Sequence, residues 1–91
     1  NLKDNLFELL SKLYDNYRLH CIDINQLWVY ETCYYTFTFE SILSVDRQRE
    51  NIIATGCVQF MQNFTDGDGQ FISFTKLDRN SWIYQFNFKI S

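Results

Sequence analysis

The side chains that most often carry chemistry are few in this sequence, and they are widely spaced. One histidine, His20, stands beside Cys21, and the other two cysteines are Cys33 and Cys57. Zinc ligands usually come in pairs two to four residues apart, and this set contains no pair at that spacing. A Cys–His nucleophile pair needs both side chains on one side, whereas adjacent residues of a strand point to opposite faces. We therefore expect thiols that pack as small apolar groups, with no metal, no cofactor and no catalytic residue.

A second pattern that suggests chemistry is the segment of residues 66–69, which contains two aspartates and two glycines, as calcium-binding loops do. An EF-hand also needs a Glu at its twelfth position and helices on both sides. The twelfth position here is Leu77, and the flanking segments have the alternation of strands. We therefore expect a hairpin turn rather than a calcium site.

Two carboxylates, Glu31 and Glu40, lie inside the expected strands. Glu31 has the same parity as Tyr35 and Phe37, so these three side chains could line one pocket. A buried carboxylate can act as a general base because burial raises its pKa. No His or second acid stands at a recognisable spacing from Glu31, and exposure at the rim of the strand is the simpler alternative.

The elements that must position these residues begin with an amphipathic helix over residues 2–17. Asp4 and Glu8 near its start and Arg18 near its end suit the helix dipole. Its apolar residues recur at spacings of three and four and form one stripe. The stripe consists of Leu2, Leu6, Leu9, Leu10, Leu13, Tyr14 and Tyr17.

The rest of the chain is typical of an antiparallel sheet. A β-region over residues 27–45 is longer than an ordinary strand, so it must bend, split or carry a bulge, for which Ser41 is a plausible site. Further strands are expected over residues 52–64, with Gly56 as a bulge or a point of close approach, over residues 70–77, and over residues 82–90. The last strand alternates most regularly. The order predicts an α+β fold: one N-terminal amphipathic helix packed on a curved antiparallel meander of four or more strands.

Aromatic residues occupy both parities of the long β-region. Trp28, Tyr30 and Tyr34 share one parity, and the other contains Tyr35 and Phe37. Because monomers rarely expose large apolar patches, we expect the second face to meet another sheet. Trp and Tyr dominate interface hot spots, so the first three are the predicted partner-binding residues. The alternative is that they belong to the core of the same chain.

Length and composition indicate one folded domain over residues 1–91. Hydrophobic residues make up 46% of the chain and aromatic residues 19%, which excludes intrinsic disorder. The net charge is −3, and the Lys and Arg residues are scattered, so no nucleic-acid partner is expected. No apolar run reaches the roughly 20 residues of a membrane-spanning helix, so we expect no membrane partner.

An odd number of cysteines without paired spacing indicates a reducing compartment, so we expect an intracellular location, cytoplasmic or nuclear. The first residue is Asn1 rather than Met, which favours a processed chain or a piece of a longer one.

Several segments together resemble the nuclear-transport-factor-2-like superfamily, whose members have a cone-shaped α+β fold. The segments are residues 35–42, 52–60, 69–74 and 78–83, with residues 5–15 as the helix before the sheet. The resemblance implies a dimerising sheet surface and a cone that is filled or holds a ligand. Classical transport members end their last strand with acidic residues that contact a GTPase, and residues 86–89 contain none. The cystatin arrangement, one helix wrapped by an antiparallel sheet, is similar to the same pattern.

These observations predict a non-enzymatic protein-interaction module that forms a homodimer or heterodimer through an aromatic sheet face. The resemblance implies a role like that of nuclear-transport or messenger-RNA-export adaptors. One alternative is a small ligand-binding or enzymatic cone that uses Glu31. Another is a viral or bacterial inhibitor or immunity protein, for which small acidic single-domain chains are common.

Overall fold

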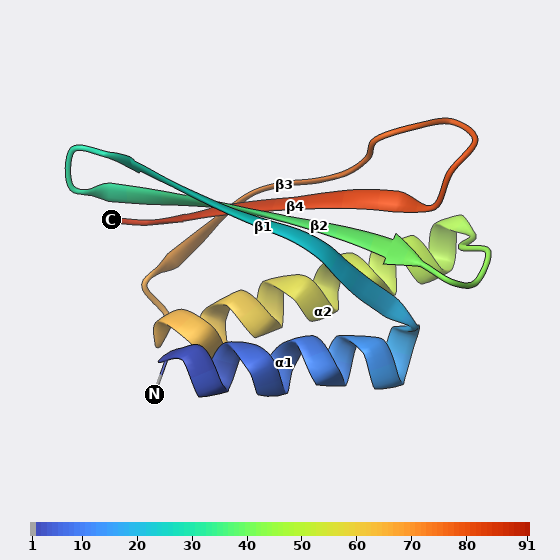
Figure 1. Ribbon diagram of the computed structural model, residues 1–91, viewed down its shortest axis with the longest axis horizontal. Helices are drawn as coiled ribbons and strands as arrows, with labels where there is room; N and C mark the ends of the chain where they lie inside the picture. Colours follow the sequence, from blue (N-terminus) through green and yellow to red (C-terminus); the bar gives the residue numbers. More distant parts are fainter. Residues whose placement is uncertain (1) are drawn as a thin grey trace.

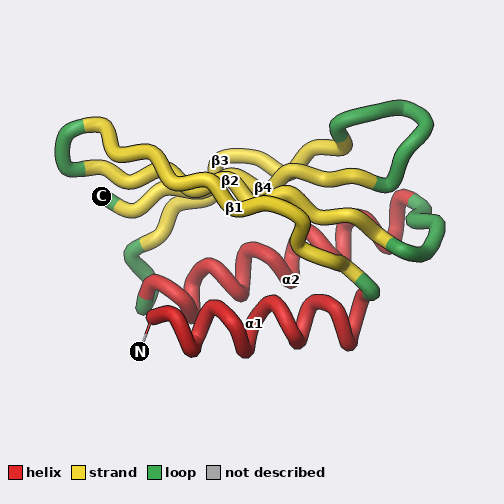
Figure 2. The backbone as a smooth tube through the Cα atoms, viewed as in Figure 1, coloured by secondary structure: helices red, strands yellow, loops and turns green. Residues whose placement is uncertain are grey.

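The computed structural model describes the backbone of residues 2–91 and the side chains from Leu6 onward. The chain alternates helices with hairpins (Figure 1), in the order α1 (Leu2–Tyr17), β1 (Leu19–Val29), β2 (Thr32–Ser41), α2 (Arg47–Thr65), β3 (Gly69–Lys76), β4 (Ile83–Ile90). One layer is the sheet, and the other consists of the two helices side by side on one face of it (Figure 2). The predicted α+β class is confirmed, with an N-terminal helix followed by four antiparallel strands and, in addition, a second helix.

The sheet has the strand order β1-β2-β4-β3, and all neighbours are antiparallel. The predicted meander is wrong in one respect, because β2 pairs with β4 rather than with β3. The helix α2 connects the two hairpins across one face of the sheet. The second hairpin joins the first through its last strand, so that β4 pairs with β2 and β3 lies at the edge. The sheet is open, with β1 and β3 as its two edges.

The predicted strand over residues 52–64 is wrong, because this segment belongs to α2. Asp46 caps the helix: its carboxylate accepts a hydrogen bond of 2.8 Å from the backbone N–H of Arg49. β-branched residues and a glycine favour a strand locally, but the large apolar residues recur with helical spacing. They are buried together against the sheet and α1, and they are Ile53, Cys57, Phe60, Met61 and Phe64.

Of the two roles predicted for Gly56, the structure shows the close approach, here between two helices, and not the β-bulge. A Cβ atom at this position would lie 3.2 Å from Cε2 of the Tyr17 ring, which is tighter than ordinary van der Waals contact. The absence of a side chain therefore lets Tyr17 at the end of α1 pack against the middle of α2. The structure needs Gly56 for packing and not for a special backbone conformation.

The long β-region splits into two strands at a two-residue turn, Tyr30 and Glu31. Tyr30 adopts a left-handed backbone conformation, with φ of 56°. The register of β1 shifts between Cys21 and Asp23, so the bulge lies in β1 and not at Ser41. Residues 19–26, which the sequence did not mark as a strand, form most of β1.

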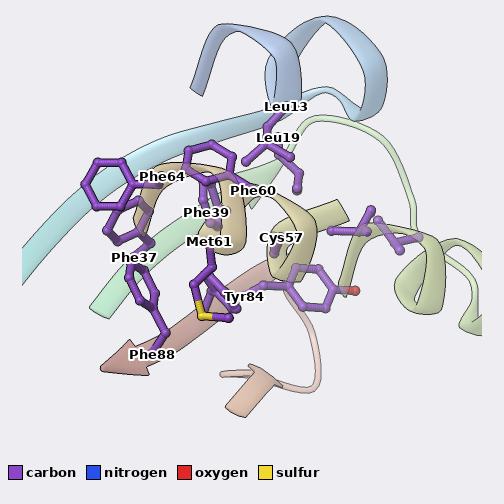
Figure 3. Packing of buried hydrophobic residues seen from close by; sticks show 13 residues of the cluster. Leu13, Leu19, Phe37, Phe39, Cys57, Phe60, Met61, Phe64, Tyr84 and Phe88 are labelled. Carbon is purple, nitrogen blue, oxygen red and sulfur yellow. The ribbon is translucent and has the colours of Figure 1, made fainter. Parts of the chain in front are cut away.

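The core lies between the sheet and the two helices (Figure 3). The rings of Phe37 and Phe88 meet nearly edge-on with centroids 5.5 Å apart, and Phe37 also contacts Phe60 of α2 at 6.4 Å. The alternation predicted for the last strand is confirmed, since Tyr84, Phe86 and Phe88 are all buried. The space next to Leu13 between the strands and α2 has no room for a water molecule. Among the described residues, the interior is filled by side chains and is not a ligand cavity.

The opposite face of the sheet is polar. The Thr36 hydroxyl donates a 2.7 Å hydrogen bond to Oδ1 of Asn87, and Nδ2 of Asn87 donates one of 3.0 Å to Oγ of Ser73. This chain of contacts crosses β2, β4 and β3. Tyr34 is the one aromatic residue that β2 presents on this face, so the expected second aromatic face is not formed.

A buried phenol makes one part of the stability sensitive to high pH. The Tyr84 hydroxyl donates a 3.1 Å hydrogen bond to Oε1 of Glu50. Burial, and then the charge of Glu50, raise the pKa of Tyr84 from 10.0 to about 12. The folded chain therefore holds this proton more tightly than the unfolded chain. Its contribution is complete below a pH of about 10 and is lost as the pH rises towards about 12.

We expect Tyr84→Phe to lose less unfolding free energy than the wild type between pH 9 and 11, because it has no phenol proton at this position. Urea unfolding at each pH measures the difference. Tyr30→Phe is the matched control, because the Tyr30 side chain is 99% exposed, and its curve should follow the wild type. Parallel curves for wild type and Tyr84→Phe would refute the assignment.

Candidate functional site

The tip of the β1–β2 hairpin exposes four consecutive large apolar side chains, Leu27, Trp28, Val29 and Tyr30. Their exposed fractions are 60%, 62%, 43% and 99%. The hairpin extends past the ends of both helices (Figure 1), so neither helix covers its tip. Single exposed apolar residues are ordinary, but a contiguous exposed apolar run on a small domain is a candidate interaction site.

The structure brings the predicted partner-binding residues Trp28, Tyr30 and Tyr34 to this same tip, although not onto one face. Trp28 pairs with Cys33 and has its side chain on the helix side of the sheet. Tyr34 pairs with Leu27 and lies on the polar side, and Tyr30 lies in the turn between the strands. The tip therefore presents apolar groups in several directions.

A shallow groove runs beside this strand, between α1 and β1. It has a volume of about 370 Å³ and is lined mainly by Phe7, Leu10, Tyr14, Leu19, His20 and Cys21. Phe7 is 76% exposed. The Tyr14 and His20 rings meet edge-on, with their centroids 6.5 Å apart. The Arg18 guanidinium lies 5.5 Å from the centroid of the Tyr14 ring. The groove therefore has an apolar floor, with two basic side chains beside Tyr14.

The groove and the hairpin tip form one continuous surface. Ile24 is 42% exposed and has its side chain on the helix side of β1, between Cys21 in the groove and Trp28 at the tip. β1 is also an edge strand, so the backbone groups on its outer side have no partner strand. We name this combination of α1–β1 groove, outer edge of β1 and hairpin tip the β1 edge surface.

The residues of the predicted pocket, Glu31, Tyr35 and Phe37, do not line a common cavity. Glu31 is exposed in the hairpin turn, whereas Phe37 is 1% exposed inside the core. Tyr35 lies between them, stacked on Phe88 with ring centroids 5.0 Å apart. Its hydroxyl oxygen accepts a 2.9 Å hydrogen bond from Nε2 of Gln26. No described pocket is lined by Glu31.

The cysteines are free thiols, and they lie in different parts of the fold. Cys33 is buried at the tip end of β2, Cys57 is buried in α2, and Cys21 is partly buried in β1. In the described part of the chain, no three His, Cys, Asp or Glu side chains come close enough to hold a metal ion. The segment of residues 66–69 joins α2 to β3, so the predicted hairpin turn is instead a helix end, with Asp66 in a left-handed conformation.

Burial makes the two thiols in α2 and β1 differ in reactivity. It raises the pKa of Cys57 to about 12, and it also raises the pKa of Cys21, which is only partly buried. We expect Cys57 to react with iodoacetamide mainly when the chain unfolds, and therefore much more slowly than the partly exposed Cys21 near neutral pH. Alkylation of the two single-cysteine variants, both carrying Cys33→Ala, can be followed by mass spectrometry. Equal rates in the folded proteins would contradict the buried position of Cys57.

Sequence reasoning missed the α1 side of this surface and the edge position of β1. One signal was available: Phe7 is a large apolar residue that lies off the apolar stripe of the predicted helix. The edge position could not be inferred, because it depends on the pairing of β2 with β4 across the chain.

No helix in the described range is both long and apolar enough to cross a membrane. Comparison of the chain with protein-family models, with curated proteins and with solved structures finds no match.

Proposed function

We propose that this chain is a non-enzymatic protein-interaction module that binds another protein chain through the β1 edge surface. The observation that carries the proposal is the exposed apolar run of residues 27–30, at the end of an edge strand whose outer side has no neighbouring strand. The filled interior and the exposed position of Glu31 favour binding over an enzymatic cone. The free thiols support a reducing, intracellular location.

The composition of β1 favours a partner over an ordinary protected edge. Natural edge strands are usually short, or they carry lysines and prolines that prevent further pairing. β1 has 11 residues, and Asp23 is its one formally charged side chain at neutral pH when His20 is neutral. Such a strand can add a further strand through its backbone, with alternate side chains contributing specificity.

The other edge of the sheet, β3, is less suited to this role. It has eight residues, and two of its aromatic rings are already used within the chain. Phe74 stacks on Tyr84 with centroids 5.1 Å apart, and Phe71 stacks on Phe86 at 6.1 Å. The rings at the β1 tip have no such partner among the described aromatic pairs, so they are available for contact.

Trp28 and Tyr30 are the expected anchors of the interface. Trp and Tyr bury large rigid surfaces at low entropic cost, and truncation of such anchors usually weakens binding by about 2 kcal/mol or more. Tyr34 and Leu27 extend the contact on the other side of the hairpin.

Site-specific photo-crosslinking tests the proposal. A benzophenone amino acid in place of Tyr30 should form covalent protein adducts on irradiation in cells that contain the chain, and in purified protein as well if the partner is a second copy. The matched control replaces Arg79, which is exposed in the turn between β3 and β4. Adducts that depend on position 30 and are reduced by Trp28→Glu support the interface. The proposal fails when neither position, or both positions equally, yields protein adducts.

A further inference from the structure

We infer that the protein partner is a second copy of this chain, joined by antiparallel pairing of the two β1 strands about a two-fold axis at Gln26. This inference rests on the proposed function and adds the identity of the partner. It follows from the backbone groups of β1 that face the open edge. It also follows from the side chains that two antiparallel β1 strands would bring together.

The backbone of β1 offers an evenly spaced row of free groups. In an antiparallel ladder, the N–H and C=O groups of successive residues point alternately towards one neighbour and away from it. Val29 and Thr32 flank a two-residue turn, so their backbone groups face each other. The backbone groups of Leu27 and Asn25, at two-residue steps back from Val29, also face β2. The backbone groups of the intervening Trp28, Gln26 and Ile24 face the open edge.

These three residues are symmetric about Gln26. A second β1 strand in antiparallel orientation would therefore pair its Gln26 with Gln26, and each Ile24 with Trp28 of the other copy. An axis at Asn25 or Leu27 would also leave outward-facing residues opposite each other, with the residue at the axis in a pair without hydrogen bonds. However, an axis at Asn25 would set Trp28 opposite Ile22, in the bulge. An axis at Leu27 would extend the ladder past Val29 and set Asp23 opposite Glu31 of the other copy, which brings like charges together. An axis at Ile24 would extend the ladder into the bulge next to Asp23. The axis at Gln26 is thus the one that uses the regular part of the edge.

Side chains match in this same register. On the helix side, the exposed Ile24 side chain of each copy would cover the exposed indole of Trp28 from the other. The two Gln26 amides would meet at the axis, where each already donates to its own Tyr35 hydroxyl. On the polar side, Asn25 would face Leu27. Asp23 would face an apolar residue and not its own copy, so the pairing brings no like charges together.

The apolar area that the β1 edge surface exposes is comparable to the area that a stable dimer buries. With this axis, the hairpin tip of each copy projects along β1 of the other, towards its α1–β1 groove. Phe7, Tyr14 and the exposed apolar residues between positions 22 and 30 offer an apolar area on the order of 800 Å² per copy at typical side-chain sizes. Standard interfaces bury roughly 800 Å² per partner, so a dimer of standard size would have to bury most of the β1 edge surface.

Disulfide formation between copies tests both the partner and the register. In a Cys21→Ala background of the full chain, Gln26→Cys would place two thiols opposite each other at the axis. Paired residues of this type have Cα atoms about 5.5 Å apart, which lies within the range for a disulfide. We expect Gln26→Cys to form a covalent dimer at least about ten-fold faster than Thr75→Cys, a matched exposed position on the other edge strand.

A mixture of two single variants checks the register independently. Asn25→Cys mixed with Leu27→Cys should form the mixed dimer in preference to either homodimer, because these positions face each other across the axis. Circular dichroism confirms that each variant is folded. Equal cross-linking at positions 26 and 75, or no preference in the mixture, would overturn the inference. Photo-crosslinks from position 30 to unlike proteins would then leave the proposed function standing, whereas their absence as well would remove both.

Discussion

Replacing Phe60 or Met61 with aspartate is expected to unfold the chain at neutral pH. Both side chains are buried, at 4% and 0% exposure, in the core beside α2 (Figure 3). An unpaired carboxylate in this environment is strongly disfavoured, and no cation lies among the buried core residues to compensate it. The expected loss is more than about 4 kcal/mol, which is most of the stability of a domain of this size.

This pair of substitutions also distinguishes a helix from a strand at α2. Successive residues of a strand face opposite sides, so a strand would bury only one of these two neighbours. The matched control is Ile52→Asp, since Ile52 is 49% exposed near the start of the helix, and this variant should remain folded. Far-ultraviolet circular dichroism and urea unfolding measure all three. A folded Phe60→Asp or Met61→Asp variant would show that the helix face is assigned wrongly.

Phe37→Ala is expected to reduce the free energy of unfolding by about 3 to 5 kcal/mol, because it opens a cavity at the centre of the aromatic core. The Phe37 ring is 1% exposed and contacts the rings of Tyr35, Phe39, Phe60 and Phe88. The filled packing around it leaves little freedom to close the gap.

The control for this cavity is Tyr34→Ala, which removes a ring of similar size from the opposite face of β2. We expect a loss below about 1.5 kcal/mol, since that ring is only partly buried. Urea unfolding at a protein concentration that gives a single species compares the two. A similar loss for both would mean that the two faces of β2 are buried to the same degree.

Local periodicity predicted α1 and β4 well because each element buries one regular stripe. In β4, the alternation of Tyr84, Phe86 and Phe88 with polar residues needs no information from the rest of the chain. The same reasoning failed for α2. There, adjacent buried residues such as Phe60 and Met61 fit only the helical period, but the β-branched residues and Gly56 favoured a strand.

The first strand was missed for two physical reasons. The bulge beside Cys21 interrupts the alternation, and the residues that follow it include exposed polar side chains such as Asn25 and Gln26. An edge strand without a buried face has no clear signal in its sequence. Trp28, Tyr30 and Tyr34 could be singled out from the sequence as candidate partner-binding residues, but their arrangement could not be predicted. The two-residue turn pairs each even-numbered residue of β1 with an odd-numbered residue of β2, and paired residues have their side chains on the same face. The two even-numbered residues Trp28 and Tyr34 therefore lie on opposite faces.

The most direct test of the β1 edge surface as an interface between copies is the solution mass by light scattering, over a range of micromolar concentrations. The wild type should have twice the mass of the chain, and a Trp28→Glu, Tyr30→Glu double variant should be a folded monomer. Both side chains are exposed, so the double variant should keep its circular dichroism spectrum. A wild type that remains a monomer throughout, or a double variant that remains a dimer, would contradict pairing through this surface.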